Sequence, residues 1–115
     1  VLGTSVTMQG TLFDDVLMNA GLDPIKPQAG DIAAFSDLLD QFFYCGRSIE
    51  GRRALTDYVR SITAGVDDVL VLLACTDLSP AFPEADGQHQ FAADGYQFMD
   101  VTAAHIDAIM QFAEK

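Results

Sequence analysis

The chain has 115 residues, of which 50% are hydrophobic, and a formal net charge of −11 at pH 7. This length and composition predict one domain over residues 1–115 with a core of its own, and exclude a disordered or fibrous protein. The acidic excess argues against nucleic acid or an anionic membrane as partner, because both require a positive protein surface. No apolar run approaches the roughly 18 residues that span a bilayer.

The first quarter of the chain predicts two short strands with a helix between them. Residues 1–4 resemble the end of a strand, with Gly3 at the turn that leaves it. Apolar residues at helical spacing predict a helix over 12–20 that ends at Gly21. The two prolines of residues 22–27 predict a short strand at an edge of the sheet.

Two longer helices are predicted next. Asp31 is expected to cap a helix with a wide apolar stripe, and Gly46 is expected to end it. A further helix is predicted from Ser48, with Gly65 at its end. Three arginines concentrate positive charge at its start, and we interpret them as a helix surface with pairing along the helix: Arg47, Arg52 and Arg53.

A short and uniformly apolar run predicts a buried strand over 69–74, of the parallel kind that is covered on both faces. Cys75 follows it directly. Thr76 and Asp77 are expected to cap a helical turn within 78–87, where prolines prevent a longer helix.

The last third of the chain predicts a hairpin and a helix. Asp94-Gly95 is typical of a type I′ turn, here between strands over 89–92 and 96–101, although a single strand over 97–101 is an alternative. Thr102 is expected to cap the final helix, whose apolar residues are expected to face inward. The element order predicts an α/β fold: a three-layer domain with a four-stranded, mainly parallel sheet flanked by helices.

Three predicted strands end in hydroxyl or thiol groups, at Thr4, at Cys75-Thr76 and at Thr102. Parallel strands end on one edge of a sheet, where open α/β sheets bind their ligands, so a small anionic ligand is expected there. The backbone N–H groups of a helix start favour the thiolate, which makes Cys75 the candidate reactive group. The alternatives are a buried structural cysteine and ordinary helix-capping threonines.

His105 follows Thr102 by one helical turn and is either part of the same site or a structural histidine. The spacing of the two cysteines and two histidines does not match a zinc site, and no glycine-rich phosphate loop is present. We therefore expect neither a metal nor a cofactor. Cys45 and Cys75 are too few for a disulfide framework, and no secretory leader is recognised, so a reducing cytoplasm is the expected location.

Residues 2–8, 71–78 and 99–105 occur in the order and spacing of the aspartate/glutamate racemase family. Two motifs support the resemblance: Cys75-Thr76 followed by an acidic residue after an apolar strand, and Asp-x-Thr-x-x-His within residues 99–105. The chain resembles the C-terminal half of the family over its whole length. The resemblance implies two similar α/β domains related by a pseudo-twofold axis, with one cysteine from each and no cofactor. Since the sequence opens within a predicted strand and lacks an initiator methionine, we expect a fragment of such a protein.

Inversion at Cα requires a base on one face of the substrate and an acid on the other, and two thiols meet that requirement. The resemblance makes Cys75 one acid/base of the pair, acting on a small amino acid or dicarboxylate. It assigns the remaining site residues to substrate binding or to assistance of the thiol: Thr4, Arg47, Thr76, Asp77, Thr102 and His105. The chain alone is expected to be inactive without its N-terminal domain or a second copy.

Two positions depart from the family: Ala74 stands where glycine is usual, and Asp77 where glutamate or histidine is usual. Cys45 does not replace the missing cysteine, because no family motif marks its helix. Two alternatives remain open. One is a non-catalytic ligand-binding or interaction domain, and the other is a related activity of the hydantoin racemase, arylmalonate decarboxylase or maleate isomerase kind.

Overall fold

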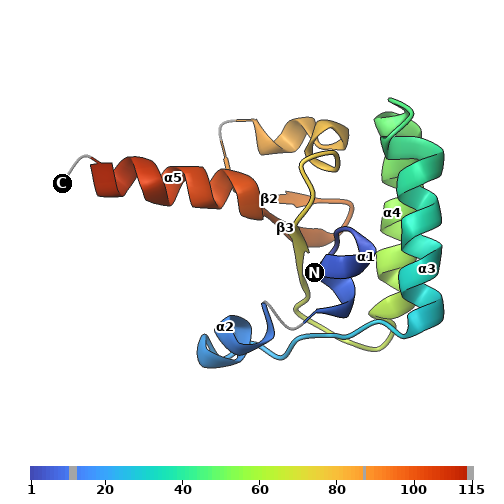
Figure 1. Ribbon diagram of the computed structural model, residues 1–115, viewed down its shortest axis with the longest axis horizontal. Helices are drawn as coiled ribbons and strands as arrows, with labels where there is room; N and C mark the ends of the chain where they lie inside the picture. The colour runs from blue at the N-terminus through green and yellow to red at the C-terminus, as the bar shows by residue number, and fades with distance from the viewer. Residues whose placement is uncertain (11–12, 87, 114–115) are drawn as a thin grey trace.

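The computed structural model describes residues 1–10, 13–86 and 88–113. Within them the protein is a small α/β domain with a three-stranded sheet in the order β1-β3-β2 (Figure 1). The strands are β1 (Leu70–Leu73), β2 (Gln90–Ala93) and β3 (Tyr96–Asp100). β1 pairs with β3 in parallel, and β2 pairs with β3 antiparallel. The sheet is therefore mixed, and the prediction of a four-stranded, mainly parallel sheet is wrong.

Both strands predicted in the first quarter of the chain fail to form as strands. In residues 1–4, only Leu2 pairs, through one parallel bridge to Leu73. Residues 22–27 form no strand. Pro24 and Pro27 lack the N–H donors that a ladder needs. Instead, the Lys26 ammonium holds this segment by donating to the Gly10 carbonyl at 2.8 Å.

The buried strand and the hairpin are confirmed with small changes of boundary. β1 covers 70–73 rather than 69–74, and it lies at the side of the sheet, whereas β3 is central. Asp94 and Gly95 both have positive φ, of 53° and 86°, as a type I′ turn requires. The turn twists β2 and β3 into register and pairs Phe91 with Phe98.

The first predicted helix forms over a shorter range, as α2 (Asp14–Asn19), and Leu12 of the prediction lies outside the described residues. A second short helix that the sequence did not predict, α1 (Ser5–Gln9), follows the bridge at Leu2. Gly21 ends α2 as predicted: its φ is 81°, and the N–H of Leu22 donates to the Leu17 carbonyl at 2.9 Å. This is the Schellman arrangement that a left-handed glycine permits.

The two longer helices are confirmed, and they lie side by side as an antiparallel pair (Figure 1). α3 (Ala29–Leu38) continues into the π-helical segment η1 (Leu39–Phe43), and α4 (Ser48–Ile62) follows. Asp31 caps α3 from its third position, by accepting the N–H of Gln28 at 3.2 Å. Gly46 and Gly65 follow η1 and α4 with positive φ.

The main core lies between this helix pair and the sheet. Val71, Leu73 and Phe98 contribute from the sheet, and they belong to one cluster with Phe35 and Leu55 of the helices. Two short 3₁₀ turns, η2 (Ser79–Ala81) and η3 (Pro83–Ala85), close the core above the hairpin. Phe82, between them, packs on Phe98 with ring centroids 4.8 Å apart.

The final helix, α5 (Val101–Ala113), projects away from the sheet on the side opposite to α3 and α4 (Figure 1). Its predicted inward stripe is not buried: Ala108, Ile109 and Ala113 are exposed, and the side chains of Ile106 and Phe112 lie outside the described residues. Within the described residues, α5 therefore does not supply the second helical layer that the three-layer prediction requires. No helix in the described part of the chain combines the length and the apolarity needed to cross a membrane.

Candidate functional site at the carboxyl end of the sheet

Strand register places three chain segments at one edge of the sheet. Leu2 pairs with Leu73, and Leu73 pairs with Asp100, all in parallel. Thr4, Cys75 and Thr102 each lie two residues beyond these partners and therefore leave the sheet at the same end. The hydroxyl groups are exposed to solvent and the thiol is half-buried.

Cys75 packs against the edge of the core and still reaches solvent. Its thiol donates to the Asp77 carboxylate, with Sγ and Oδ2 3.9 Å apart. The N–H of Leu78 donates to the Cys75 carbonyl at 3.1 Å, which closes a tight turn after β1. Asp77 thus lies beside the thiol through this turn.

The helix start expected after Cys75 is much weaker than the sequence suggests. Only the single 3₁₀ turn η2 follows, its N-cap is Leu78, and no side chain caps it. Thr76 and Asp77 are therefore not helix caps, and both are exposed. A macrodipole needs a longer run of aligned peptides, so helix electrostatics contribute little at this thiol.

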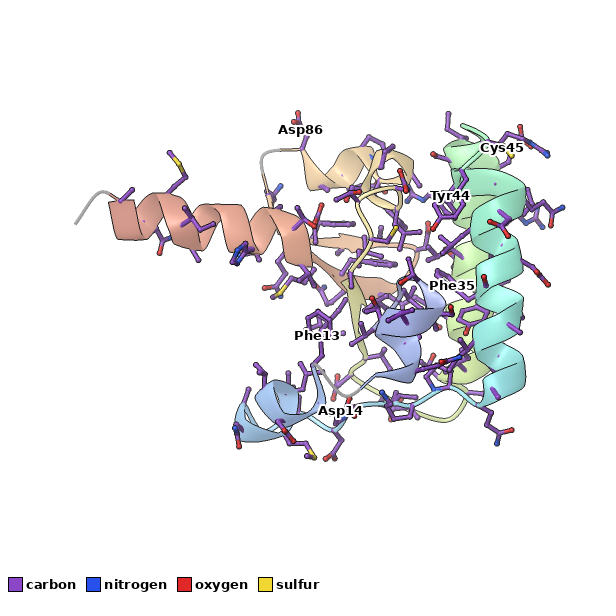
Figure 2. The ribbon with its side chains drawn as sticks, viewed as in Figure 1. Phe13, Asp14, Phe35, Tyr44, Cys45 and Asp86 are labelled. Atoms are coloured by element: carbon purple, nitrogen blue, oxygen red, sulfur yellow. The ribbon has the colours of Figure 1, made fainter. Side chains whose placement is uncertain are left out.

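Tyr44 is a neighbour of Cys75 that sequence reasoning missed. It follows the π-helical segment η1, and its N–H donates to the Leu39 carbonyl five residues earlier at 2.9 Å. Figure 2 shows Tyr44 at the end of the α3–α4 pair that lies beside the loops above the sheet. Partial burial raises the pKa of the Tyr44 phenol, and Cys75 and Asp77 add to the rise. A phenol, a thiol and a carboxylate therefore meet at this edge.

The remaining predicted site residues are Arg47, Thr102 and His105. Arg47 is exposed and paired with Glu50 one turn along α4. Thr102 and His105 are exposed on the first turns of α5. Thr102 does not cap that helix, because Asp100 does, by accepting the N–H of Ala103 at 3.1 Å. The structure thus brings Cys75 and Asp77 together and adds Tyr44, while Arg47 is engaged elsewhere.

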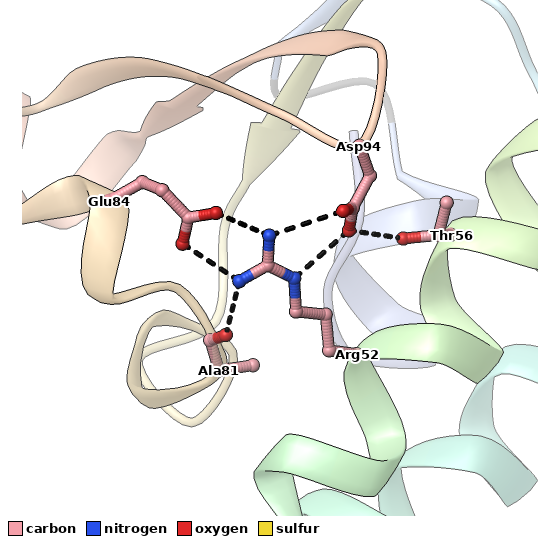
Figure 3. Close-up of polar contacts among 5 residues, drawn as sticks. All are labelled: Arg52, Thr56, Ala81, Glu84 and Asp94. Atoms are coloured by element: carbon pink, nitrogen blue, oxygen red, sulfur yellow. Dashed lines mark hydrogen bonds and ion pairs between the residues drawn. The ribbon is translucent and has the colours of Figure 1, made fainter.

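Arg52 was expected to pair along its own helix, but it joins three separate elements (Figure 3). Its guanidinium donates to Asp94 in the hairpin turn at 2.9 Å, to Glu84 of η3 at 2.7 Å, and to the Ala81 carbonyl at 3.3 Å. Thr56 adds a hydrogen bond to Asp94 at 3.0 Å. All these donors and acceptors are satisfied, so we assign the network to the fold rather than to a binding site.

Within the described residues, no three histidine, cysteine or acidic side chains gather closely enough to hold a metal ion. Comparison with protein-family models, with curated proteins and with solved structures found no match to this chain.

Proposed function

We propose that Cys75 is one acid/base of a cofactor-independent amino-acid racemase of the aspartate/glutamate type, in which this chain forms half of a two-cysteine site. The observation that supports the proposal is the register that brings Thr4, Cys75 and Thr102 to one edge of the sheet. A thiol that is half-buried but open to solvent can meet a substrate there.

In this proposal the thiol Sγ exchanges a proton with Cα of the substrate. Asp77 accepts the hydrogen bond of the thiol and orients its proton. The hydroxyls of Thr4, Thr76 and Thr102 bind substrate carboxylate, and His105 borders the site from α5. The opposite face of the substrate needs a second thiol, from an N-terminal domain or from a second copy of the chain.

A non-catalytic ligand-binding domain is the second candidate, and the charge around Cys75 favours it. Asp77 lies beside the thiol, and Asp40 and Asp77 both contribute to the raised pKa of the Tyr44 phenol. Arg47, the basic residue expected to contact the substrate, is paired with Glu50. This surrounding negative charge suits a neutral or cationic ligand better than a dicarboxylate.

Deuterium exchange at Cα separates the two candidates. The 115-residue chain, and the polypeptide extended by its upstream coding sequence, are incubated in D₂O with L- and D-aspartate and glutamate, and with a panel of hydantoins. Arylmalonates are assayed for decarboxylation, and maleate for isomerisation. We expect no exchange by the chain alone, and exchange by the extended protein that Cys75→Ser lowers at least 100-fold.

Site-resolved alkylation provides the control, with exposed Cys45 as the internal reference. If the extended protein exchanges no substrate and Cys75 reacts with iodoacetamide with the same pH profile as Cys45, the racemase proposal is wrong and the binding domain is favoured. Turnover by the chain alone that disappears in Cys75→Ser would instead show that two copies complete the site.

A further inference from the structure

A cavity of about 330 Å³ lies at the amino end of β1, opposite to the end that carries Cys75. Its walls come from α2, the segment 22–27, the end of α4 and β1. This volume lies within the range of about 300–1,000 Å³ that small-molecule sites occupy. The proposed racemase site does not include any of these walls, so the cavity is a separate feature of the molecule.

Most side chains that line the cavity are apolar, and several remain accessible from its mouth. Leu22, Ile25 and Val66, which line the cavity, are 43%, 37% and 50% exposed. Apolar surface in contact with water costs about 25 cal/mol per Å². The other apolar walls include Leu17, Pro24, Pro27, Ile62 and Leu70. An apolar ligand body is therefore stabilised here by desolvation.

Three carboxylates line the same cavity: Asp23, Asp67 and Asp68. All three are exposed, and none of them has a hydrogen bond or an ion pair within the described residues. The basic side chains that do form ion pairs are paired with other acids: Lys26, Arg47, Arg52 and Arg60.

We propose that this cavity binds an amphiphilic cation, with an apolar body inside the walls and an ammonium group held by Asp23, Asp67 and Asp68. The apolar walls and the unpaired carboxylates act on different parts of one ligand. An apolar anion would enter the same walls but would be repelled at the mouth. The cavity does not include Cys75, so a failure of the racemase proposal would leave this proposal unaffected.

Amide chemical-shift titration of the intact chain tests the proposal with three probes of equal length: n-octylammonium, n-octanol and octanoate. At low ionic strength, where carboxylate charge is least screened, we expect n-octylammonium to perturb amides in 22–25 and 62–70. We also expect it to bind at least tenfold more tightly than octanoate. Equal affinity for the two ions, or perturbations centred elsewhere in the fold, would overturn the proposal.

Two triple variants with the same net charge isolate the carboxylates. The rim variant is D23N/D67N/D68N, in which Asn at 68 tolerates the positive φ of 56° that Asp68 adopts. The control variant is D15N/D37N/D86N, whose exposed carboxylates do not line the cavity. We expect the rim variant to weaken n-octylammonium at least fivefold without affecting n-octanol, and the control to retain the affinity. Equal weakening by both variants would contradict the assignment.

A cavity-filling substitution tests the walls. Ile62→Phe on α4 places a larger side chain into the cavity, and we expect it to weaken both n-octylammonium and n-octanol at least fivefold. The amide spectrum of each variant reports whether it is folded. If Ile62→Phe does not fold, Val66→Phe in the exposed loop serves the same purpose. Unchanged binding of both probes to a folded filling variant would refute the cavity as their site.

Discussion

At the scale of single residues, Gly51 controls the contact between α4 and η1. A methyl group on Gly51 would lie 2.7 Å from Cβ of Phe42 and 3.0 Å from the ring of Phe43. The Cβ of Phe42 moves only with its backbone and the Phe43 ring is buried, so the two segments would have to move apart. Gly51 is fully buried at this contact.

We expect Gly51→Ala to destabilise the protein by up to about 2 kcal/mol in urea unfolding, since overpacking costs about 1–3 kcal/mol and the better helix former recovers about 1 kcal/mol of it. The control is Gly30→Ala in α3, where a Cβ would contact nothing within 4 Å. That variant should be more stable than wild type. A Gly51→Ala protein as stable as Gly30→Ala would show that the contact is not tight.

The Arg52 network predicts a specific sensitivity to acid. Hydrogen bonds from Arg52 hold the pKa values of Glu84 and Asp94 below their ordinary values of 4.5 and 3.8. As the pH falls, the two carboxylates therefore take up protons in the unfolded chain before they do so in the folded protein. The stabilisation from the network is fully present above the ordinary pKa values, and it is lost as the pH falls through the lowered pKa values of the folded protein. Asp94→Asn keeps a residue that tolerates positive φ and removes one titrating partner.

We expect Asp94→Asn to be less stable than wild type at pH 6 and to lose less stability between pH 4 and pH 2. Thermal unfolding at a series of pH values measures both effects. Asp37→Asn, which removes an exposed carboxylate outside the network, should follow the wild-type profile. An Asp94→Asn profile parallel to that of wild type across the acid range would contradict the role of Arg52.

Local residue signals predicted local features well and distant partners poorly. Asp94-Gly95 and the glycines that end helices act through their own backbone, so a sequence window contains the whole cause. Arg52 and Asp94 are 42 positions apart, and Tyr44 and Cys75 come from different elements. Such contacts depend on how elements pack, and no periodicity in a window encodes them.

At the scale of elements, Asp100 fastens α5 to the loop that follows β1. One carboxylate oxygen accepts the N–H of Ala103 at 3.1 Å, and the other accepts the hydroxyl of Ser79 in η2. The sequence predicted Thr102 as the cap because a hydroxyl residue precedes apolar residues at helical spacing. The strand ends at Asp100, one residue earlier than predicted, so that the carboxylate rather than the Thr102 hydroxyl reaches the first free N–H groups of α5.

We expect Asp100→Ala to destabilise the protein by about 1 kcal/mol, within the range of about 0.5–2 kcal/mol that is usual for loss of a capping side chain. Thr102→Ala should change the stability by less than about 0.5 kcal/mol, as exposed substitutions away from such features do. Urea unfolding of both variants measures the difference. Equal costs for the two would mean that the carboxylate does not cap α5.

Two predictions failed because the segment concerned lacks a partner to pack or pair with. Residues 22–27 have the apolar content of a strand, but Pro24 and Pro27 lack the backbone N–H donors that a sheet needs. The contacts of the Lys26 ammonium hold this segment in place instead. The stripe of α5 has the period of a buried helix, yet nothing in the described chain covers Ile109 or Met110. Periodicity predicts that a face will be apolar, and it cannot tell which molecule covers that face.

At the scale of the whole molecule, α5 extends an apolar surface beyond the domain. Ile109 and Met110 are 52% and 56% exposed on it, and the helix contacts the sheet at β1 and β3. Exposed apolar surface of this kind favours association.

We expect the chain to dimerise at micromolar concentrations, as measured by sedimentation velocity. Ile109→Glu should weaken the dimer about tenfold or more, because burial of an isoleucine side chain contributes about 1.5–3 kcal/mol. Ile49→Glu on α4, at a residue 86% exposed, is the matched control and should leave association unchanged. A wild-type chain that remains monomeric at every concentration, or an equal effect of the two variants, would rule out α5 as the contact.

The π-helical segment η1 has a consequence for how this site can change. A π-helical turn closes its hydrogen bond one residue further along the chain than an α-helical turn does, so η1 holds one residue more than regular winding would. Deletion of one amino acid within 40–43 would turn the bond from the Tyr44 N–H to the Leu39 carbonyl into the ordinary i→i−4 bond, and Tyr44 would stay over the same turn. The same deletion within α3 would instead rotate the preceding residues by about 100° relative to Tyr44, since one turn takes 3.6 residues. The loss of one codon at η1 would therefore leave the phenol beside the thiol.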